Sequence, residues 1–372
     1  MSNSKIYTVL GIMTGTSMDG IDLSLVKTDG KNYINIISEK SYQYSLIIQK
    51  KLKNIVEKKP NEIKKIIKYF NKFEKQVSQI IINKINKFFI EFDIKKNKVE
   101  LIGLSGQTVY HNPQKRITIQ LGSAEKISNF FNIKVVSNFR LKDINNGGEG
   151  APIGSYYHRY LINKINRKAV IVNIGGVSNF TQIKNRNLFS SDIGPGNAII
   201  DDLSMYFYNK KFDKNGLFAK KGNINKKILN KFKKDIFFRK KLPKSLDRNY
   251  FKLYINLLKK IKKNDAINTA LYFTIFSIEN IFKIKSNKYI NELILTGGGR
   301  KNKFLLKNLK NLLNNIKVNT IDKYNYDGDL IESQMFGYIA VRSLKKLIIS
   351  TPNTTNNYKA ISGGELTIPN KK

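Results

Sequence analysis

Apolar runs that end in glycine-rich turns recur three times along the chain. Residues 6–12 form a β-rich apolar run and residues 21–26 alternate, which predicts two strands joined by a tight turn that contains Asp19-Gly20. Residues 170–181 repeat this pattern around a Gly-Gly pair, and residues 293–296 run into three glycines before a helical pattern. The chain therefore predicts a strand followed by a glycine turn at three separate places.

Helical and strand-like patterns fill the rest of the chain. Residues 46–92 carry apolar positions at helical spacing, and Pro60-Asn61 divides them into two predicted helices. Further helices are predicted at residues 124–131, 266–284, 304–313 and 335–347, and further strands at residues 99–104, 116–121 and 135–140.

Length and composition limit the class of protein. A chain of 372 residues is long enough for two cores, and its hydrophobic content of 41% is that of a globular protein. The count of 0 Cys excludes disulfides, thiolate zinc sites and iron–sulfur clusters. No stretch approaches the roughly 18 apolar residues of a membrane helix, and the first apolar run is a predicted strand, so we expect a cytoplasmic protein without a signal peptide.

The chain is strongly basic. Lys+Arg number 67 against 27 Asp+Glu, a formal charge of +40, which could indicate nucleic-acid or anionic-membrane binding. The excess is mostly lysine, spread over nearly every predicted helix together with much Asn and Ile, the usage that AT-rich genomes favour. We therefore interpret the lysines as solvated surface residues and expect neither a nucleic-acid nor a membrane partner.

The first turn has the residues that a phosphate group needs. Gly15 allows close approach of the backbone, and Thr14, Thr16 and Ser17 offer hydroxyls. Asp19 and Asp22 lie nearby and could hold Mg²⁺ or its waters. A plain surface hairpin would look similar, but the three glycine loops together indicate a nucleotide held between two lobes. Neither a Walker-type motif nor a Gly-x-Gly-x-x-Gly motif is present.

Two further polar segments are candidates for chemistry. Arg140 and Asp143 follow a predicted strand and could grip a sugar carboxylate and hydroxyls, although a loop salt bridge would use the same residues. Asp192 precedes a rigid Gly-Pro-Gly turn near the second glycine loop, which suits a general base. Alternatively, Asp192 is a turn residue and Asp201 and Asp202 are solvated helix charges.

Several of these segments, in this order, resemble the motifs of the anhydro-N-acetylmuramic acid kinase family, which belongs to the superfamily of acetate and sugar kinases, heat-shock ATPases and actin. The matching segments are Met13-Thr14-Gly15-Thr16-Ser17-Met18-Asp19-Gly20, Gly106-Gln107-Thr108, Phe139-Arg140 with Asp143 and Gly147-Gly148, Asn173-Ile174-Gly175-Gly176, Asp192-Ile193-Gly194-Pro195-Gly196-Asn197, Pro243-Lys244-Ser245, Thr296-Gly297-Gly298-Gly299, and Glu332 with Phe336. The resemblance covers nearly the whole chain, and the ordered set is far more specific than any one motif.

The resemblance implies an α/β, two-lobed actin-like ATPase fold of ribonuclease-H-like domains, with the active site in the interlobe cleft. Residues 1–133 would form the N-terminal lobe with the first phosphate loop. Residues 134–372 would form the C-terminal lobe with the second phosphate loop, the catalytic Asp and the adenosine loop. We leave open that the last helix packs back on the N-terminal lobe, and that the protein is a homodimer.

Matching positions in the resemblance also imply a role for individual residues. The first phosphate loop would be Gly15, Thr16, Ser17, Met18, Asp19, Gly20, Ile21 and Asp22, the second Asn173, Gly175 and Gly176, and the border of the adenosine Gly297, Gly298 and Gly299. Asp192 would be the catalytic base, and the residues near the sugar would be Gln107, Thr108, Arg140, Asp143 and Glu332. ATP and Mg²⁺ are the implied cofactors, and the carboxylate that contacts the metal stays open.

The implied reaction couples hydrolysis to phosphorylation. Asp192 would take a proton from a water that attacks the anomeric carbon of 1,6-anhydro-N-acetylmuramic acid, and the released six-position oxygen would accept the γ-phosphoryl group of ATP. The product, N-acetylmuramic acid 6-phosphate, implies a place in peptidoglycan recycling and amino-sugar catabolism.

The chain departs from the family pattern at three positions. Ser105 stands where we expect His, Asn138 where Asp is usual, and Glu149 where Gln is usual. These departures bear on sugar binding more than on ATP binding. Two alternatives therefore remain: a related sugar kinase that acts on an ordinary hydroxyl, and a catalytically silent, basic nucleic-acid-binding protein.

Overall fold

The computed structural model describes residues 5–15, 18–60, 62–284 and 287–370, and these residues divide into two compact units. The first unit comprises Met1–Tyr157 with Leu330–Lys372, and the second comprises His158–Asp329. The division therefore differs from the boundary that we expected near residue 133. The first unit is larger because β7 (Lys134–Ser137) pairs with β4 (Leu101–Leu104) and because the chain returns to this unit at residue 330.

A six-stranded sheet forms the centre of the first unit, with the order β13-β7-β4-β1-β2-β3. Its remaining strands are β1 (Tyr7–Met13), β2 (Gly20–Thr28), β3 (Ile34–Gln43) and β13 (Glu365–Thr367). β2 runs antiparallel to both β1 and β3, whereas β4 runs parallel to β1 and to β7. β13 adds an antiparallel edge that only the return of the chain can supply.

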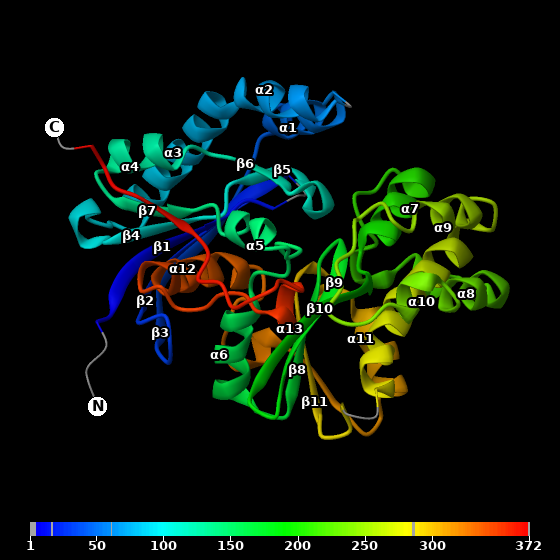
Figure 1. Cartoon of the computed structure of the whole chain (residues 1–372). Helices are drawn as coiled ribbons and strands as arrows, with labels where there is room; N and C mark the ends of the chain where they lie inside the picture. Colours follow the sequence, from blue (N-terminus) through cyan, green and yellow to red (C-terminus); the bar gives the residue numbers. More distant parts are fainter. Residues whose placement is uncertain (1–4, 16–17, 61, 285–286, 371–372) are drawn as a thin grey trace. The chain divides into compact units, whose positions relative to one another are not determined.

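Helices cover both faces of this sheet, as Figure 1 shows. One face packs against α1 (Leu46–Glu57), α2 (Ile63–Asn71), α3 (Glu74–Glu91) and α4 (Ala124–Phe131) through apolar side chains such as Leu10, Ile12 and Phe88. The region 46–92, expected as two helices, contains three, because a turn that neither glycine nor proline marks separates α2 from α3. α5 (Leu141–Asn145), α13 (Pro352–Thr355) and the hairpin of β5 (Gln107–Asn112) with β6 (Ile117–Leu121) complete the unit.

The last long helix, α12 (Ile331–Leu344), lies on the opposite face, against β1, β2 and β4. Glycines in these strands make the approach close. A Cβ atom on Gly11 would lie 1.9 Å from the carbonyl oxygen of Ser333, and one on Gly103 would lie 2.2 Å from that of Phe336. The helix backbone therefore rests on strand backbone, and a side chain at either glycine would push it away.

The second unit has a five-stranded sheet with the order β10-β9-β8-β11-β12. Its strands are β8 (Ala169–Ile174), β9 (Val177–Lys184), β10 (Asn187–Pro195), β11 (Glu292–Thr296) and β12 (Lys317–Thr320). β8 is antiparallel to β9 and parallel to β11, and β11 is parallel to β12. The helices of this region are α6 (Ser155–Ile165), α7 (Ala198–Tyr208), α8 (Lys226–Lys233), α9 (Lys252–Leu258), α10 (Lys263–Lys283) and α11 (Lys303–Leu312).

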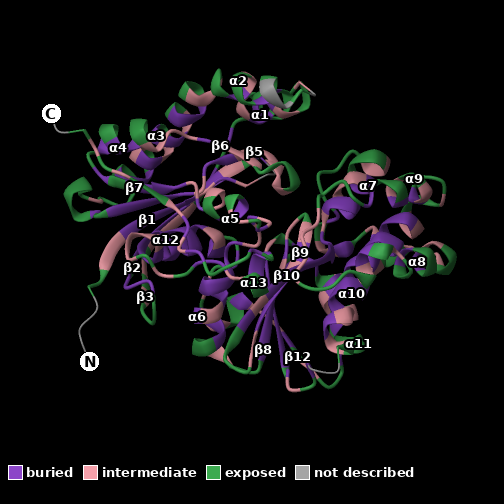
Figure 2. Ribbon diagram, viewed as in Figure 1, coloured by how far each residue is buried: buried purple, intermediate pink, exposed green. Residues whose placement is uncertain are grey.

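Both units therefore follow one plan, in which three antiparallel strands precede two strands parallel to the first. β1, β2 and β3 correspond to β8, β9 and β10, while β4 and β7 correspond to β11 and β12. Figure 2 shows that the central strands of each sheet are mostly buried and that exposed residues lie on the outer sides of the helices. This repeated plan is that of the actin-like ATPase fold, so the expected fold class is confirmed. Among the described residues, no helix combines the length and the apolar run that crossing a bilayer requires.

Candidate active site

The Gly-Gly turn between β8 and β9 is tied to the start of α7. The backbone N–H of Asn197 donates to the carbonyl of Gly175 at 2.7 Å, and that of Ala198 donates to the carbonyl of Gly176 at 3.2 Å. The side-chain amide of Asn197 reaches back to the carbonyl of Ile174 at 3.2 Å. The short turn after Asp192 therefore sets the position of the second glycine loop.

The third glycine loop lies beside the second because β11 pairs with β8. Thr296 pairs with Asn173 in this ladder, and a Cβ on Gly299 would lie 2.2 Å from Cγ2 of Ile174. Gly297 has a φ of 74°, and its Cβ would lie 2.3 Å from Oδ1 of Asn173. The structure thus brings together six residues that the sequence predicted for the nucleotide: Asn173, Gly175, Gly176, Gly297, Gly298 and Gly299.

At three of these positions, nothing in the surrounding protein requires glycine. A Cβ on Gly175 or Gly298 would meet nothing closer than 3.5 Å and 3.8 Å respectively, and one on Gly176 nothing closer than 3.8 Å. None of the three has a positive φ that would exclude other residues. A side chain at these positions would project into the space that a ligand needs for close approach to the backbone. These residues therefore fit a bound nucleotide.

A buried arginine holds the third loop in place. The side chain of Arg300 is only 4% exposed, and it donates to Asp322 at 2.9 Å, to Asp329 at 2.7 Å and to the carbonyl of Gly297 at 3.1 Å. Burial alone would raise the pKa of Asp322, but hydrogen bonds and charge from Arg300 lower it to about 2. The loop is therefore fixed by an ion-pair cluster that the sequence analysis did not identify.

Asp192 is held by the segment that follows residue 243. Its backbone N–H donates to the carbonyl of Lys244 at 3.0 Å, and its Oδ2 accepts from the N–H of Leu246 at 2.8 Å. The residue is 7% exposed, and a bulge in β10 separates it from Gly194. A carboxylate oriented by a backbone amide, next to the second glycine loop in sequence, is suited to accept a proton in a defined direction.

Of the two aspartates that we considered as solvated helix charges, Asp201 is affected by burial, whereas the side chain of Asp202 is 37% exposed and pairs with an arginine. Asp202 accepts from Nη2 of Arg248 at 2.8 Å. Burial raises the pKa of Asp201 to about 7, and the neighbouring charge of Asp202 adds to this rise, while Arg248 opposes it. Arg248 was missed because it lies 46 residues from Asp202 in a loop without a glycine motif.

The turn between β1 and β2 in the first unit is partly described, since Thr16 and Ser17 lie outside the described residues. The carbonyl of Gly15 accepts from the N–H of Met18 at 3.1 Å and from Nε2 of Gln107 at 2.8 Å. The side chains of Met18 and Ile21 are buried in the core, so only their backbone is available to a ligand. Gly20 begins β2, where a Cβ would lie 2.7 Å from the carbonyl oxygen of Tyr42.

The carboxylates of this turn lie near a buried hydroxyl. Burial raises the pKa of Tyr44, and the charges of Asp22 and Asp19 raise it further. Both carboxylates therefore lie close enough to Tyr44 to act on its hydroxyl. Among the described residues, no group of three metal-ligating His, Asp or Glu side chains is found.

Ser105, one of the three departures from the family pattern, also supports this turn. Its Oγ accepts from the N–H of Thr14 at 3.0 Å. Gln107 is fully buried, and its Oε1 has no hydrogen-bond partner in the part of the chain that the structure describes. Thr108, which follows it on β5, is half-buried. An unpaired buried acceptor next to Gly15 is unusual and marks a place where a ligand donor would be favourable.

Arg140 and Glu332 form the charged part of the expected sugar site. Burial raises the pKa of the Glu332 carboxyl, and the nearby charge of Arg140 opposes this rise. Burial, followed by the charge of Arg140, lowers the pKa of His111 to about 4. Nη1 of Arg140 donates to the carbonyl of Gly150 at 2.8 Å, and a ring nitrogen of His111 bonds the carbonyl of Glu149 at 3.1 Å.

Asp143, which we expect near the sugar, is enclosed by hydrogen-bond donors from this chain. It is 0% exposed, and its carboxylate accepts hydrogen bonds from four groups at 2.6–2.7 Å: the N–H of Gly150, the hydroxyls of Ser350 and Thr355, and the side-chain amide of Asn357. It therefore fixes the loop whose Gly150 carbonyl holds Arg140. Asn138, with a φ of 52°, donates to Glu365 at the edge of β13 instead of contributing a charge here.

Comparisons with known proteins agree on one family. The family model described as anhydro-N-acetylmuramic acid kinase matches residues 7–369. The protein named anhydro-N-acetylmuramic acid kinase in Pelagibacter ubique is 37% identical over 377 residues, with 97% of this chain and 98% of that protein covered. The protein of that name in Bradyrhizobium diazoefficiens is 33% identical over 370 residues, with 98% and 100% covered. Component A of the (R)-2-hydroxyglutaryl-CoA dehydratase of Acidaminococcus fermentans matches in structure with a TM-score of 0.44 at 13% identity, covering 90% of this chain and 99% of that one, which is too remote to bear on the activity.

Proposed function

We propose that this chain, which belongs to the anhydro-N-acetylmuramic acid kinase family, opens 1,6-anhydro-N-acetylmuramic acid with water and phosphorylates it from ATP. The product is N-acetylmuramic acid 6-phosphate, an intermediate for peptidoglycan recycling and amino-sugar catabolism. One observation carries the proposal. Gly175, Gly176 and Gly298, where the surrounding protein does not require glycine, lie in the same unit as Asp192. Because the reaction uses ATP, we place the protein in the cytoplasm.

The residues of the chain divide the work of binding. The second and third glycine loops take the nucleotide, with Gly175, Gly176 and Gly298 allowing its close approach. Asp19 and Asp22 are the carboxylates available to Mg²⁺, which when bound supplies charge neutralisation to the transferring phosphoryl group. Arg140 and Glu332 serve the sugar, with Arg140 suited to its lactyl carboxylate.

Asp192 performs the proton transfer. Its carboxylate removes a proton from water as the water oxygen attacks the anomeric carbon and the bond from that carbon to the six-position oxygen breaks. The released oxygen takes the γ-phosphoryl group, ADP leaves, and Asp192 later returns its proton to solvent. General-base assistance of this kind contributes typically about 10²–10⁴-fold to the rate.

A labelling experiment tests both steps at once. The protein is incubated with ATP, Mg²⁺ and the anhydro sugar in ¹⁸O-water, and the product is analysed by mass spectrometry. One ¹⁸O at the anomeric position together with one phosphate supports the coupled reaction. A phosphorylated sugar without label would instead favour a kinase that acts on an ordinary hydroxyl.

The variant Asp192→Asn separates the base from the binding site. We expect the labelled product to disappear while the ATP affinity stays within about twofold, because Asn keeps the acceptor for the Leu246 N–H but cannot take a proton. Full activity in this variant would contradict the role of Asp192.

A further inference from the structure

One cationic side chain lies directly over the second glycine loop, and nothing in the motif pattern assigned it a role. A Cβ on Gly176 would lie 3.9 Å from Nε and 4.0 Å from Cδ of Arg248. The guanidinium therefore borders the same open space that the glycine leaves above the backbone. Arg248 comes from the loop between η5 (Ile236–Arg239) and α9, so the chain brings it to this point from a distant segment.

One hydrogen bond holds the guanidinium of Arg248, and its other N–H groups can donate to a ligand. Its Nη2 donates to Oδ1 of Asp202 at 2.8 Å, and Asp202 lies in the first turns of α7, the helix that the Gly-Gly loop bonds. The side chain is 51% exposed, and among the described residues its guanidinium makes no hydrogen bond other than the one to Asp202. A guanidinium carries five donors in a planar fork, which matches the geometry of phosphate oxygens.

We propose that Arg248 is a phosphate ligand, with its guanidinium held by Asp202 and donating hydrogen bonds to the phosphate oxygens of a nucleotide bound over Gly175-Gly176. Asp202 is then a positioning residue, since it acts on the nucleotide only through Arg248. This inference rests on the proposed function, because it takes the nucleotide to lie at the second glycine loop.

Nucleotide binding without the sugar provides the test. ATP, ADP and adenosine, the first two with Mg²⁺, are titrated calorimetrically into the wild-type protein and into Arg248→Gln. We expect the affinity for ATP to fall about 10- to 100-fold, the range for hydrogen bonds to charged groups, and adenosine binding to stay unchanged. A loss for ATP alone assigns the contact to the γ-phosphate, and a loss for both ATP and ADP assigns it to the α- or β-phosphate.

Arg167→Gln is the matched control. Arg167 is exposed just before β8, at the end of that strand opposite Gly175, so the same loss of charge leaves the site intact. Equal ATP affinity in Arg248→Gln and Arg167→Gln overturns the inference, as does an equal loss of adenosine and ATP affinity. A change confined to the KM of the sugar would assign Arg248 to the sugar carboxylate and also overturn it.

A double-mutant cycle tests the positioning role of Asp202. Asp202→Ala should weaken ATP binding when Arg248 is present and should have no further effect in Arg248→Gln. Additive losses would show that Asp202 acts independently of Arg248.

The proposed function and this inference fail in different ways. A wild-type protein that binds no ATP overturns both. A wild-type protein that binds ATP but leaves the anhydro sugar unchanged contradicts only the proposed substrate, and the comparison of Arg248→Gln with Arg167→Gln remains decisive.

Discussion

Two neighbouring glycines in the third loop face different surroundings. Gly298 has no atom within 3.8 Å of the place where a Cβ would stand, whereas the Cβ of Gly299 would lie 2.2 Å from Cγ2 of Ile174. Only the second glycine is therefore required by packing within the protein. Under the proposed function, the first allows close approach of the nucleotide to the backbone.

Alanine should therefore affect ATP binding at Gly298 and the stability of the fold at Gly299. We expect Gly298→Ala to keep the wild-type unfolding temperature but to weaken ATP binding by at least several-fold. Gly299→Ala should lose roughly 1–3 kcal/mol of stability, the range for overpacking. Thermal unfolding and ATP titration of both variants check this, and unchanged ATP affinity in Gly298→Ala would contradict the assigned nucleotide position.

Asp201 makes the stability of the protein depend on pH. Its folded pKa of about 7 exceeds the ordinary value of 3.8, so the folded state binds more protons between these limits and loses stability as pH rises from about 4 to 7. Asp201→Asn removes this loss. We expect the variant to gain stability relative to wild type at pH 8 but not at pH 4, as measured by urea unfolding. A gain of equal size at both pH values would show that proton uptake is not the cause.

Single residues show where prediction from sequence succeeds and where it stops. The glycines were predicted because strand ends carry a local signature. The pair of Arg248 with Asp202 was not predicted, since its partners meet only through the fold. The four donors that surround the carboxylate of Asp143 were not predicted either, because they come from segments about 200 residues apart in the sequence.

The packing of α12 depends on close contacts between its backbone and the backbone of two strands. It rests on β1 and β4 through backbone contacts that Gly11, Gly103 and Gly337 permit. We expect Gly11→Ala to lose roughly 1–3 kcal/mol or more, because its Cβ would lie 1.9 Å from the carbonyl oxygen of Ser333.

Thermal unfolding measures this loss, with Gly175→Ala as the matched control. A Cβ on Gly175 would meet nothing closer than 3.5 Å, so the control should unfold at the wild-type temperature. If the two variants unfold together, the close packing of α12 does not contribute to stability.

Element boundaries followed the strength of the local pattern. The helix predicted at residues 124–131 coincides with α4, which Ser123 caps by accepting from the N–H of Lys126. β13, only three residues long, was not predicted, because its only signal is pairing with β7 on a distant part of the chain. The pairing of β7 with β4 likewise extends the first unit beyond the boundary that we expected near residue 133.

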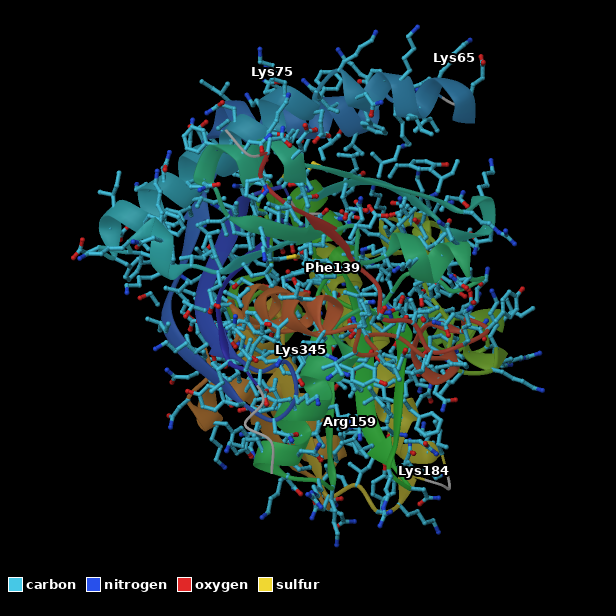
Figure 3. The ribbon with its side chains drawn as sticks, turned by 60° about the vertical axis from the view of Figure 1, so that its left-hand side comes forward. Lys65, Lys75, Phe139, Arg159, Lys184 and Lys345 are labelled. Atoms are coloured by element: carbon cyan, nitrogen blue, oxygen red, sulfur yellow. The ribbon has the colours of Figure 1, made fainter. Side chains whose placement is uncertain are left out.

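The basic charge is a property of the whole surface. Figure 3 shows Lys65 and Lys75 on α2 and α3, and Lys184 at the end of β9, with side chains that point away from the ribbon, whereas Phe139 lies inside against Phe336. Lysines in such places lie at the surface, where water solvates them. The expectation that no nucleic acid is a partner stays a prediction.

Removal of the C-terminal segment should destabilise the first unit and leave the second unit folded. The chain that ends at Asp329 lacks α12 and β13, so one face of the first sheet loses its cover, while the second unit keeps its sheet and helices. We expect limited proteolysis to leave a resistant fragment close to residues 158–329 and to degrade residues 1–157. A resistant fragment that contains β1 to β4 would contradict this, and the full chain digested in parallel is the control.

The place of α12 at the end of the chain also has a consequence for synthesis. Residues 1–157 leave the ribosome long before residues 330–372 are made. One face of the first sheet therefore lacks α12 while the second unit is synthesised and folds. During that interval, the glycine-lined face of β1 and β4 is a surface on which chaperones and proteases can act. We therefore expect a premature stop anywhere before α12 to yield a chain that the cell degrades, so that only a fully translated message produces working protein.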